Sequence, residues 1–128
     1  MNSEITWVLR DAVIAIHGRQ IAEHGGSDGV RDQGLLLSAL ARPENLYDQS
    51  DNRDLAALAA AYAFGIAKSH PFMDGNKRTA LVVARTFLKI NGADMSASQD
   101  EKYTTFLKLA QGALSEEELA EWIRNKLV

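Results

Sequence analysis

The residue types that could carry out chemistry are concentrated in one stretch of nine residues, at positions 70–78, which reads His-Pro-Phe-Met-Asp-Gly-Asn-Lys-Arg. The stretch lies between two segments with helical patterns, so it is predicted to be a short loop that leads into the first turn of a helix. The first N–H groups of a helix are unpaired and lie at the positive end of its dipole, and they therefore favour an anion. Lys77 and Arg78 in that turn oppose this preference. A bound anion that they share with the backbone, most commonly phosphate, would resolve the conflict.

His70 is the candidate general base of this stretch. An ordinary imidazole titrates close to neutral pH, which suits it to accept a proton from a hydroxyl. The alternative is that His70 only ends the preceding helix, because Pro71 follows it and the residue before a proline disfavours helical backbone. The carboxylate and the cations that follow in the chain favour the base.

Asp74 has two candidate roles, which are compatible with each other. It lies at or near the N-cap of the predicted helix, and it could also hold Mg²⁺, which proteins usually bind through one or two carboxylates together with substrate phosphates. Gly75 would let the backbone approach a ligand closely. Asn76 either completes an anion pocket or only starts the helix. Phe72 is expected to anchor the loop in the core.

Lys77 and Arg78 are the candidate phosphate ligands, the arginine through its bidentate fork and the lysine as a point charge. The polar side chains of the predicted helix over 76–90 fall within a stripe of about 120°, which includes Arg78 but not Lys77. Solvation alone would therefore explain Arg78 but not Lys77. Both cations suit a phosphoryl-type transition state, in which positioning and charge neutralisation provide most of the catalysis.

The elements that must position these residues are predicted to be almost all helical. The predicted helices span 4–23, 33–41, 54–68, 76–90, 99–111 and 116–127. Asp32 is a candidate N-cap, and the last two helices each begin with a capping box, Ser98 with Glu101 and Ser115 with Glu118. The helix over 76–90 is apolar outside its polar stripe, so we expect it to be central and largely buried.

Three weaker features are expected to carry no chemistry of their own. The polar stretch 43–52 is predicted to be a loop, either an ordinary surface loop or a flap that docks a target through Tyr47. The glycine-rich segment 24–29 lacks the Lys-Ser/Thr ending of a P-loop and is predicted to be a plain loop. His17 and His24 lie on one helical face, where two lone histidines are expected at the surface and not at a metal site.

The bulk composition restricts the classes of function. A chain of 128 residues is expected to form one domain, 1–128, with a real core. Its formal net charge of −3 argues against sequence-independent nucleic-acid binding and leaves only a local basic patch for it. The absence of cysteine excludes disulfides and thiolate chemistry, and it is compatible with the cytoplasm. No apolar run reaches the length of a membrane span, so no membrane partner is expected.

The stretch 70–78 resembles the signature of the Fic/Doc family, His-x-Phe-x-Asp-Gly/Ala-Asn-Lys-Arg. The all-helical layout and the segment from Gly25 to Leu40 also look like Doc-type toxins, so the resemblance covers most of the chain. In Fic adenylyltransferases the signature continues as Gly-Asn-Gly-Arg-x-x-Arg. Here Lys77 stands in place of the second glycine and Leu81 in place of the second arginine. A lysine there occupies space that the α- and β-phosphates need, and the missing arginine removes a phosphate partner, so the resemblance favours the Doc branch.

The Doc resemblance implies an all-α Fic fold of about six helices around a buried central helix. It implies a toxin kinase that transfers the γ-phosphate of ATP to a threonine or serine hydroxyl of elongation factor Tu and stops translation in the cytoplasm. Carried over by position, the base is His70 and the Mg²⁺ ligand is Asp74. The anion pocket is formed by Gly75 and Asn76, and the ATP phosphates are bound by Lys77 and Arg78.

The resemblance also implies a separate inhibitor. Fic enzymes that inhibit themselves carry Ser/Thr-x-x-x-Glu-Gly/Asn, and no serine or threonine of this sequence has a glutamate four residues later. Restraint is therefore expected from a Phd-like antitoxin that inserts a segment into a groove. No direct nucleic-acid partner is expected.

Two alternatives stay open at this point. One is a Fic-type protein adenylyltransferase, which would transfer AMP instead of phosphate. The other is a non-enzymatic module that binds an anion in the same pocket and acts as a co-regulator with an antitoxin. A metal-dependent phosphohydrolase is disfavoured, because it would need more clustered histidine and aspartate ligands than the sequence offers.

Overall fold

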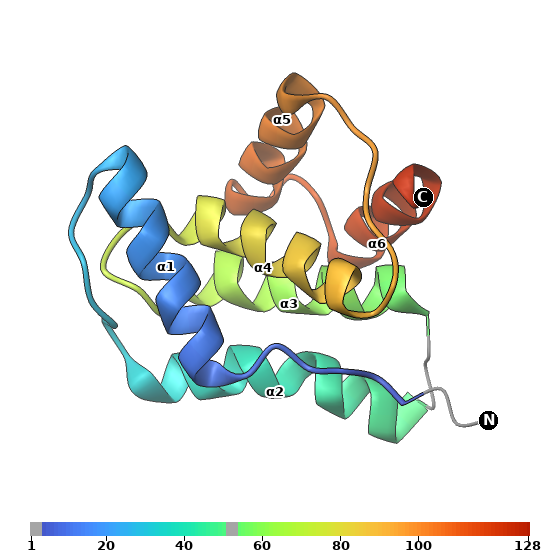
Figure 1. The fold of residues 1–128 in the computed structure, drawn as a ribbon, viewed down its shortest axis with the longest axis horizontal. Coiled ribbons are helices and arrows are strands. Elements are labelled where there is room, and N and C mark those ends of the chain that lie inside the picture. Colours follow the sequence, from blue (N-terminus) through green and yellow to red (C-terminus); the bar gives the residue numbers. More distant parts are fainter. Residues whose placement is uncertain (1–3, 51–53) are drawn as a thin grey trace.

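The structure, a computed structural model, describes residues 4–50 and 54–128, and this part of the chain is built from helices (Figure 1). They are α1 (Arg10–His24), α2 (Gln33–Ser50), α3 (Leu55–Ser69), α4 (Asn76–Ile90), α5 (Gln99–Ala110) and α6 (Glu116–Lys126). Strand-like pairing within the described residues is limited to two isolated bridges, Val30 with Phe72 and Met95 with Leu127. The predicted all-α fold is confirmed.

Two neighbouring helices, α3 and α4, form the centre of the molecule. Figure 1 shows α2 along one side of α3, α1 crossing α4, and α5 and α6 on the remaining side. Buried residues occupy nearly every turn of α3, from Ala56 to Ala67, because this helix is apolar around its whole circumference. Among the described residues, however, no helix is both long enough and apolar enough to cross a membrane.

The buried residues of α4 lie on one face and include Val83, Ala84, Phe87 and Leu88. This face packs against α3, so the expected buried central helix is confirmed, with α3 sharing the centre. Only residues 70–75 separate the two helices, so the chain reverses and the end of α3 lies beside the start of α4. The reversal brings the signature stretch to one end of the helical core.

Local hydrogen bonds begin several helices at the predicted residues. Both capping boxes are formed, at Ser98 with Glu101 and at Ser115 with Glu118. The carboxylate of Asp32 accepts a hydrogen bond from the N–H of Leu35 at 3.0 Å, as an N-cap does. These interactions join residues three positions apart, which is why the sequence alone reveals them.

The first predicted helix is wrong at its N-terminal end. The helix is predicted over 4–23, but α1 begins at Arg10 and residues 4–9 are not helical. The hydroxyl of Tyr62 on α3 accepts a hydrogen bond from the N–H of Val8 at 2.9 Å and donates to the carbonyl of Val8 at 3.4 Å. A tertiary contact therefore satisfies the backbone groups that a helix would have paired.

The predicted loop over 43–52 is also wrong. Helix α2 runs through Pro43 to Ser50, and positions 51 and 52 lie outside the described residues. A proline inside a helix removes one hydrogen bond. Packing outweighs that loss here, because Tyr47 makes an edge-on contact with Trp7 at a centroid distance of 5.6 Å and rests against the core. The hypothesis that this segment is a docking flap depended on its being a loop, and it is therefore not supported.

The Tyr62 contact predicts how stability depends on alkaline pH. Burial raises the pKa of Tyr62 from 10.0 to about 12. The unfolded chain therefore loses the phenolic proton before the folded chain does, so this stabilisation is complete below pH 10 and is lost as the pH rises to about 12. Urea unfolding should show a steeper decline over this range for the parent protein than for Tyr62→Phe. At neutral pH, Tyr62→Phe should be less stable by about 1 kcal/mol, because it leaves Val8 unpaired.

Tyr103→Phe is the matched control, since Tyr103 is 57% exposed. The stability of Tyr103→Phe should depend on pH in the same way as that of the parent protein over the whole range. Equal alkaline slopes for the parent and Tyr62→Phe would contradict this account of the contact.

Candidate functional site

His70 lies at the end of α3 in a backbone conformation that residues other than glycine rarely adopt. Its φ and ψ are 50° and 59°, and among the described residues it is the only non-glycine with positive φ. The N–H of His70 bonds to the carbonyl of Ile66 at 3.2 Å, so its backbone caps the helix. Its side chain is exposed and takes no part in that cap. Strained backbone of this kind often occurs at functional sites, and here it leaves the imidazole accessible.

Arg31 holds the strained residue in place. Its Nε donates to the carbonyl of His70 at 2.8 Å, and its Nη2 donates to the carbonyl of Ser69 at 2.9 Å. The last carbonyls of a helix have no partner within the helix, and a cation there also interacts favourably with the dipole. Arg31 was not among the predicted site residues, because no local pattern connects it to a partner 39 residues away.

The start of α4 is tied to the loop by Asn76. Its Oδ1 accepts from the N–H of Phe72 at 3.0 Å, and its Nδ2 donates to the carbonyl of Phe72 at 3.1 Å. Phe72 itself is 1% exposed, which confirms its predicted role as an anchor. The amide of Asn76 is thus engaged by the protein, and only its backbone N–H would be offered to an anion.

The carboxylate of Asp74 lies between α4 and the connection from α1 to α2. Its Oδ1 accepts from the N–H of Gly75 at 2.9 Å, and its Oδ2 lies 3.4 Å from the N–H of Ser27. Gly75, with φ of 72°, is the N-cap of α4, so Asp74 precedes the cap and does not form it. Glycine at position 26 leaves room for this carboxylate, because a Cβ there would lie 2.8 Å from Oδ2 of Asp74.

The glycine-rich connection is a loop, as predicted, and it pairs with the signature stretch. The N–H of Met73 donates to the carbonyl of Gly29 at 3.0 Å, and the N–H of Arg31 donates to the carbonyl of Pro71 at 2.7 Å. An isolated bridge joins Val30 and Phe72 in the same region. The connection therefore shapes the candidate site by holding its backbone.

His17 contradicts the expectation that both histidines of α1 lie at the surface. Its side chain is 1% exposed, its ring stacks on Phe72 at a centroid distance of 3.9 Å, and its Nε2 lies 2.8 Å from the carbonyl of Asp74. The signal was its spacing, because the other buried residues of α1 are Val13 and Gln20, which lie on the same helical face. His24 is exposed, as expected.

The two cations lie on the first turn of α4, which contains no acidic residue. In contrast to α3, α5 and α6, the N-cap of α4 forms no side-chain hydrogen bond to described residues. Lys77 is half-buried, as its position outside the polar stripe suggested, and its Nζ lies 4.5 Å from the ring centroid of Tyr103. This cation–π contact gives Lys77 a partner within the protein, so its position alone does not require an anion.

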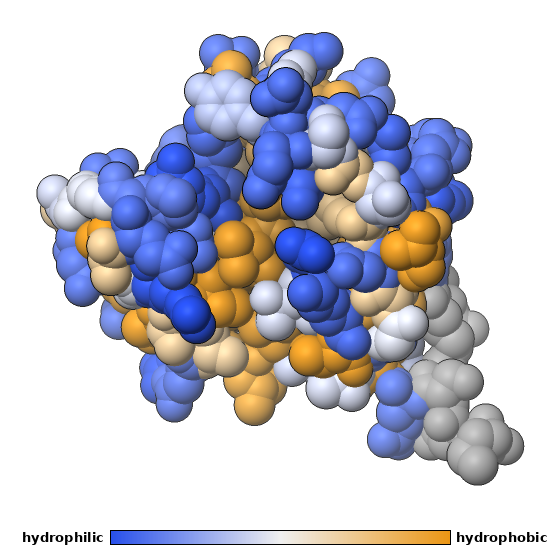
Figure 2. All heavy atoms as spheres, turned by 45° about the horizontal axis from the view of Figure 1, so that its top comes forward, coloured by the Kyte–Doolittle hydropathy of each residue, from blue (hydrophilic) through white to orange (hydrophobic). Residues whose placement is uncertain are grey.

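Arg78 is exposed, and it shares a cavity of about 80 Å³ with Lys77. The other residues lining this cavity are Leu81, Gln99, Tyr103 and Phe106. Figure 2 shows a hollow with apolar surface that is flanked by hydrophilic side chains. The cations therefore stand at the border between a polar helix start and an apolar recess.

The donor set around Asp74 limits the kind of metal site that could exist. Within the described residues, no group of three or more histidine, cysteine, aspartate or glutamate side chains could hold a metal ion. A site with few protein ligands suits Mg²⁺, which keeps several waters and binds substrate phosphates. The exposed carboxylate of Asp74 beside an anion-favouring helix start fits that pattern.

Two glycine substitutions should separate the cost of backbone strain from the steric effect of a new Cβ on the carboxylate of Asp74. Gly25 and Gly26 both have positive φ, 83° and 117°, but only at position 26 would a Cβ meet Asp74. Each change to alanine should cost about 1–2 kcal/mol through the backbone. Gly26→Ala should also displace the carboxylate and shift the Gly75 amide resonance in an NMR spectrum, whereas Gly25→Ala should leave it in place. Identical Gly75 shifts in the two variants would contradict the described packing.

Comparisons with known proteins agree with this geometry. The model of the Fic/DOC family matches residues 7–88. The chain is 46% identical to Toxin Doc of Mycolicibacterium smegmatis over 77 residues, which is 59% of each chain. It is 32% identical to Protein kinase doc of Escherichia phage P1 over 115 residues, which is 90% of each chain. The chain therefore belongs to the Fic/DOC family.

Proposed function

We propose that this chain is a Doc-type toxin that acts as a protein kinase. It would transfer the γ-phosphate of ATP to a threonine or serine hydroxyl of elongation factor Tu and thereby stop translation. Family membership and the names of the two relatives support a toxin with phosphotransferase activity. The target and the γ-phosphate come from the resemblance of the signature.

One structural observation carries the proposal. A single short turn of chain holds an accessible imidazole at His70, an exposed carboxylate at Asp74, and a helix start that bears Lys77 and Arg78. The connection from α1 to α2 contacts this stretch at two points. Arg31 donates to the carbonyl of His70, and the N–H of Ser27 lies near the carboxylate of Asp74. One hydrophobic core runs through the described residues, which supports treating 1–128 as one Fic/Doc domain.

His70 would act as the general base. Its imidazole would accept the proton of the target hydroxyl while the hydroxyl oxygen forms a bond to the γ-phosphorus. The bond between that phosphorus and the oxygen bridging to the β-phosphate breaks, and ADP leaves. The left-handed backbone at His70 supports this role, because it directs the chain into the loop without using the imidazole as a cap.

Asp74 would hold Mg²⁺ together with the phosphates of ATP. Bound Mg²⁺ would neutralise negative charge on the phosphoryl oxygens. The backbone N–H groups at Gly75 and Asn76 would complete the anion pocket. Glycine suits position 75 because its φ is 72° and because a Cβ there would lie 3.2 Å from the side chain of Ile21.

Lys77 and Arg78 would bind the remaining phosphate oxygens and stabilise the charge of the transition state. Leu81 supports γ-phosphate transfer over AMP transfer, because it gives an apolar wall to the cavity at the position where the adenylyltransferase signature has an arginine. AMP transfer is the second candidate, and a non-enzymatic module that binds an anion is the third.

The expected inhibitor is a separate Phd-like antitoxin, and the expected place of action is the cytoplasm. The sequence lacks the self-inhibitory motif of other Fic enzymes. The apolar hollow in Figure 2 supports a bound segment of another chain, since exposed apolar recesses commonly bind protein partners.

Labelled ATP separates the candidate activities. The purified protein should transfer label from γ-labelled ATP, and not from α-labelled ATP, to elongation factor Tu. His70→Ala should reduce the rate by about 100- to 10,000-fold through loss of the base, and Asp74→Ala should also abolish most transfer. Transfer of α-label would instead establish AMP transfer. If both variants still arrest growth as the parent does, the mode of action is not catalytic.

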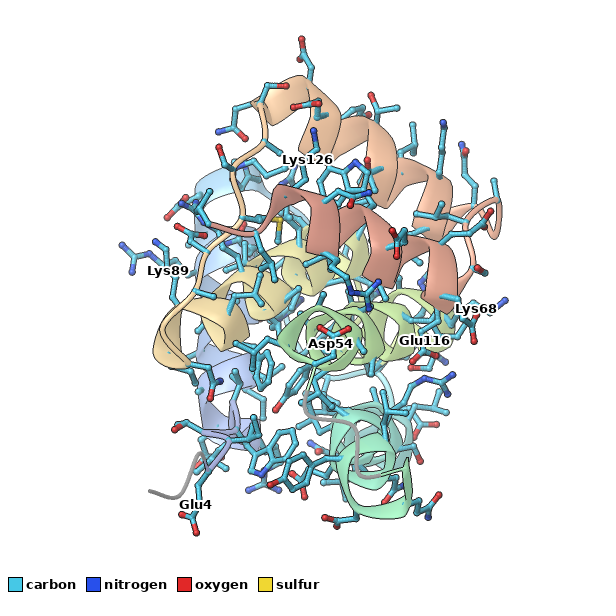
Figure 3. All side chains as sticks on the ribbon, turned by 90° about the vertical axis from the view of Figure 1, so that its right-hand side faces the viewer. Glu4, Asp54, Lys68, Lys89, Glu116 and Lys126 are labelled. Atoms are coloured by element: carbon cyan, nitrogen blue, oxygen red, sulfur yellow. The ribbon has the colours of Figure 1, made fainter. Side chains whose placement is uncertain are left out.

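The cations should affect the binding of ATP. Lys77→Ala and Arg78→Ala should each raise the KM for ATP by about 10-fold or more, because each removes a charged contact to phosphate. Lys89→Ala is the matched control: Lys89 is on the last turn of the same helix, is exposed, and points away from the bundle (Figure 3). An equal effect of all three changes would indicate a general effect of net charge and contradict a specific phosphate contact.

A further inference from the structure

We propose that His17 is a positioning residue of the anion pocket. Its Nε2–H holds the carbonyl of Asp74 and thereby sets the direction of the Gly75 N–H. The inference rests on the proposed function, because it assigns to His17 the support of the same phosphate-binding backbone. His17 belongs to α1, outside the signature stretch, and neither its sequence context nor the family signature gives it a role.

The direction of the hydrogen bond follows from its partner. A carbonyl oxygen can only accept, so the Nε2 of His17, 2.8 Å from the carbonyl oxygen of Asp74, must carry the hydrogen. In the neutral imidazole Nδ1 then carries none. Nδ1 lies 3.6 Å from Oδ1 of Asp28, too far for a hydrogen bond. Of these two contacts, only the one from Nε2 to the carbonyl of Asp74 is therefore a hydrogen bond.

A fixed carbonyl also fixes the N–H of the same peptide unit. The peptide bond is planar and trans, so its C=O and N–H point in opposite directions. Holding the Asp74 carbonyl toward α1 turns the Gly75 N–H away from α1. In this structure that N–H donates to Oδ1 of Asp74 at 2.9 Å, so a bound phosphate oxygen would take the place of this carboxylate oxygen as its acceptor.

The ring of His17 has little freedom to move. It is 1% exposed and stacks on Phe72 with an angle of 7° between the ring planes. Phe72 is in turn held by two hydrogen bonds with Asn76 at the start of α4: its N–H donates to Oδ1 of Asn76, and its carbonyl accepts from Nδ2. A donor fixed in this way can orient a peptide without rearrangement when a ligand binds, which is how preorganised sites gain strength.

If His17 only packed in the core, its substitutions would have different effects. Two substitutions distinguish this packing role from the positioning role. His17→Phe keeps an aromatic ring against Phe72 but has no donor. His17→Gln loses the ring but carries an amide N–H close to the position of Nε2. If His17 only fills the core, the phenylalanine variant should perform better in every assay. If it positions the peptide, the glutamine variant should bind phosphate better even where it is the less stable of the two.

The test is calorimetric binding of inorganic tripolyphosphate with Mg²⁺, combined with NMR of the Gly75 amide, thermal unfolding, and kcat and KM for ATP. We expect His17→Phe to lose about 10-fold or more in tripolyphosphate affinity and in KM for ATP. His17→Gln should retain most of the affinity, and the Gly75 amide should shift with tripolyphosphate in the parent and in this variant only. Val13→Ala, on the same buried face of α1, controls for lost stability and should bind as the parent does.

Failure of the inference and failure of the proposed function give different results. Absence of phosphotransfer by the parent, with the expected order of tripolyphosphate affinities, would reject the kinase and support the role of His17. Parent-like binding by His17→Phe, or affinities that simply follow the melting temperatures, would overturn the inference. So would a parent protein that does not bind tripolyphosphate. His17→Leu, which also lacks a donor, provides the same comparison if His17→Phe does not fold.

Discussion

The candidate site depends on the hydrogen bonds between two loops, the connection from α1 to α2 and the signature loop from α3 to α4. The signature loop buries Pro71 and Phe72 but leaves its other side chains at least partly exposed, so packing alone would not fix the backbone of the whole loop. Its backbone is instead paired with the connection at Pro71 and Met73, and Arg31 closes the end of α3. This pairing allows the strained backbone of His70 to persist, because the surrounding bonds determine its conformation. The imidazole of His70 and the start of α4, the proposed base and the proposed phosphate site, are thereby kept on one short stretch of chain.

The parts of the fold that could be predicted from the sequence are those decided by residues close together in the chain. Helix α4 has the predicted bounds, because an apolar pattern and the Asn-Gly pair after Ile90 mark its extent. Both capping boxes are formed between residues three positions apart. Phe72 anchors the loop as expected, since a large apolar residue in a polar loop has few other uses. In each case local chemistry and the final structure agree.

The parts that could not be predicted are decided by partners far away in the chain. The bond from Arg31 to the carbonyl of His70 spans 39 residues, and the contact of His17 with Asp74 spans 57. Arginine and histidine are also common at protein surfaces, so residue type alone did not identify Arg31 and His17 as supports of the site. The helix over Pro43 and the non-helical start of the chain have the same cause, because contacts of Tyr47 and Tyr62 outweigh local preference. The sequence therefore predicted which residues lie together in the candidate site, but not the distant residues that support them.

The central claim is that the start of α4 binds the terminal phosphate of ATP within reach of His70. A crystal structure of the protein with Mg²⁺ and a non-hydrolysable ATP analogue tests this claim most directly. We expect the γ-phosphate to contact the backbone N–H groups at Gly75 and Asn76, with the metal ion on Asp74. An α-phosphate at that position, or a nucleotide bound away from the first turn of α4, would contradict it.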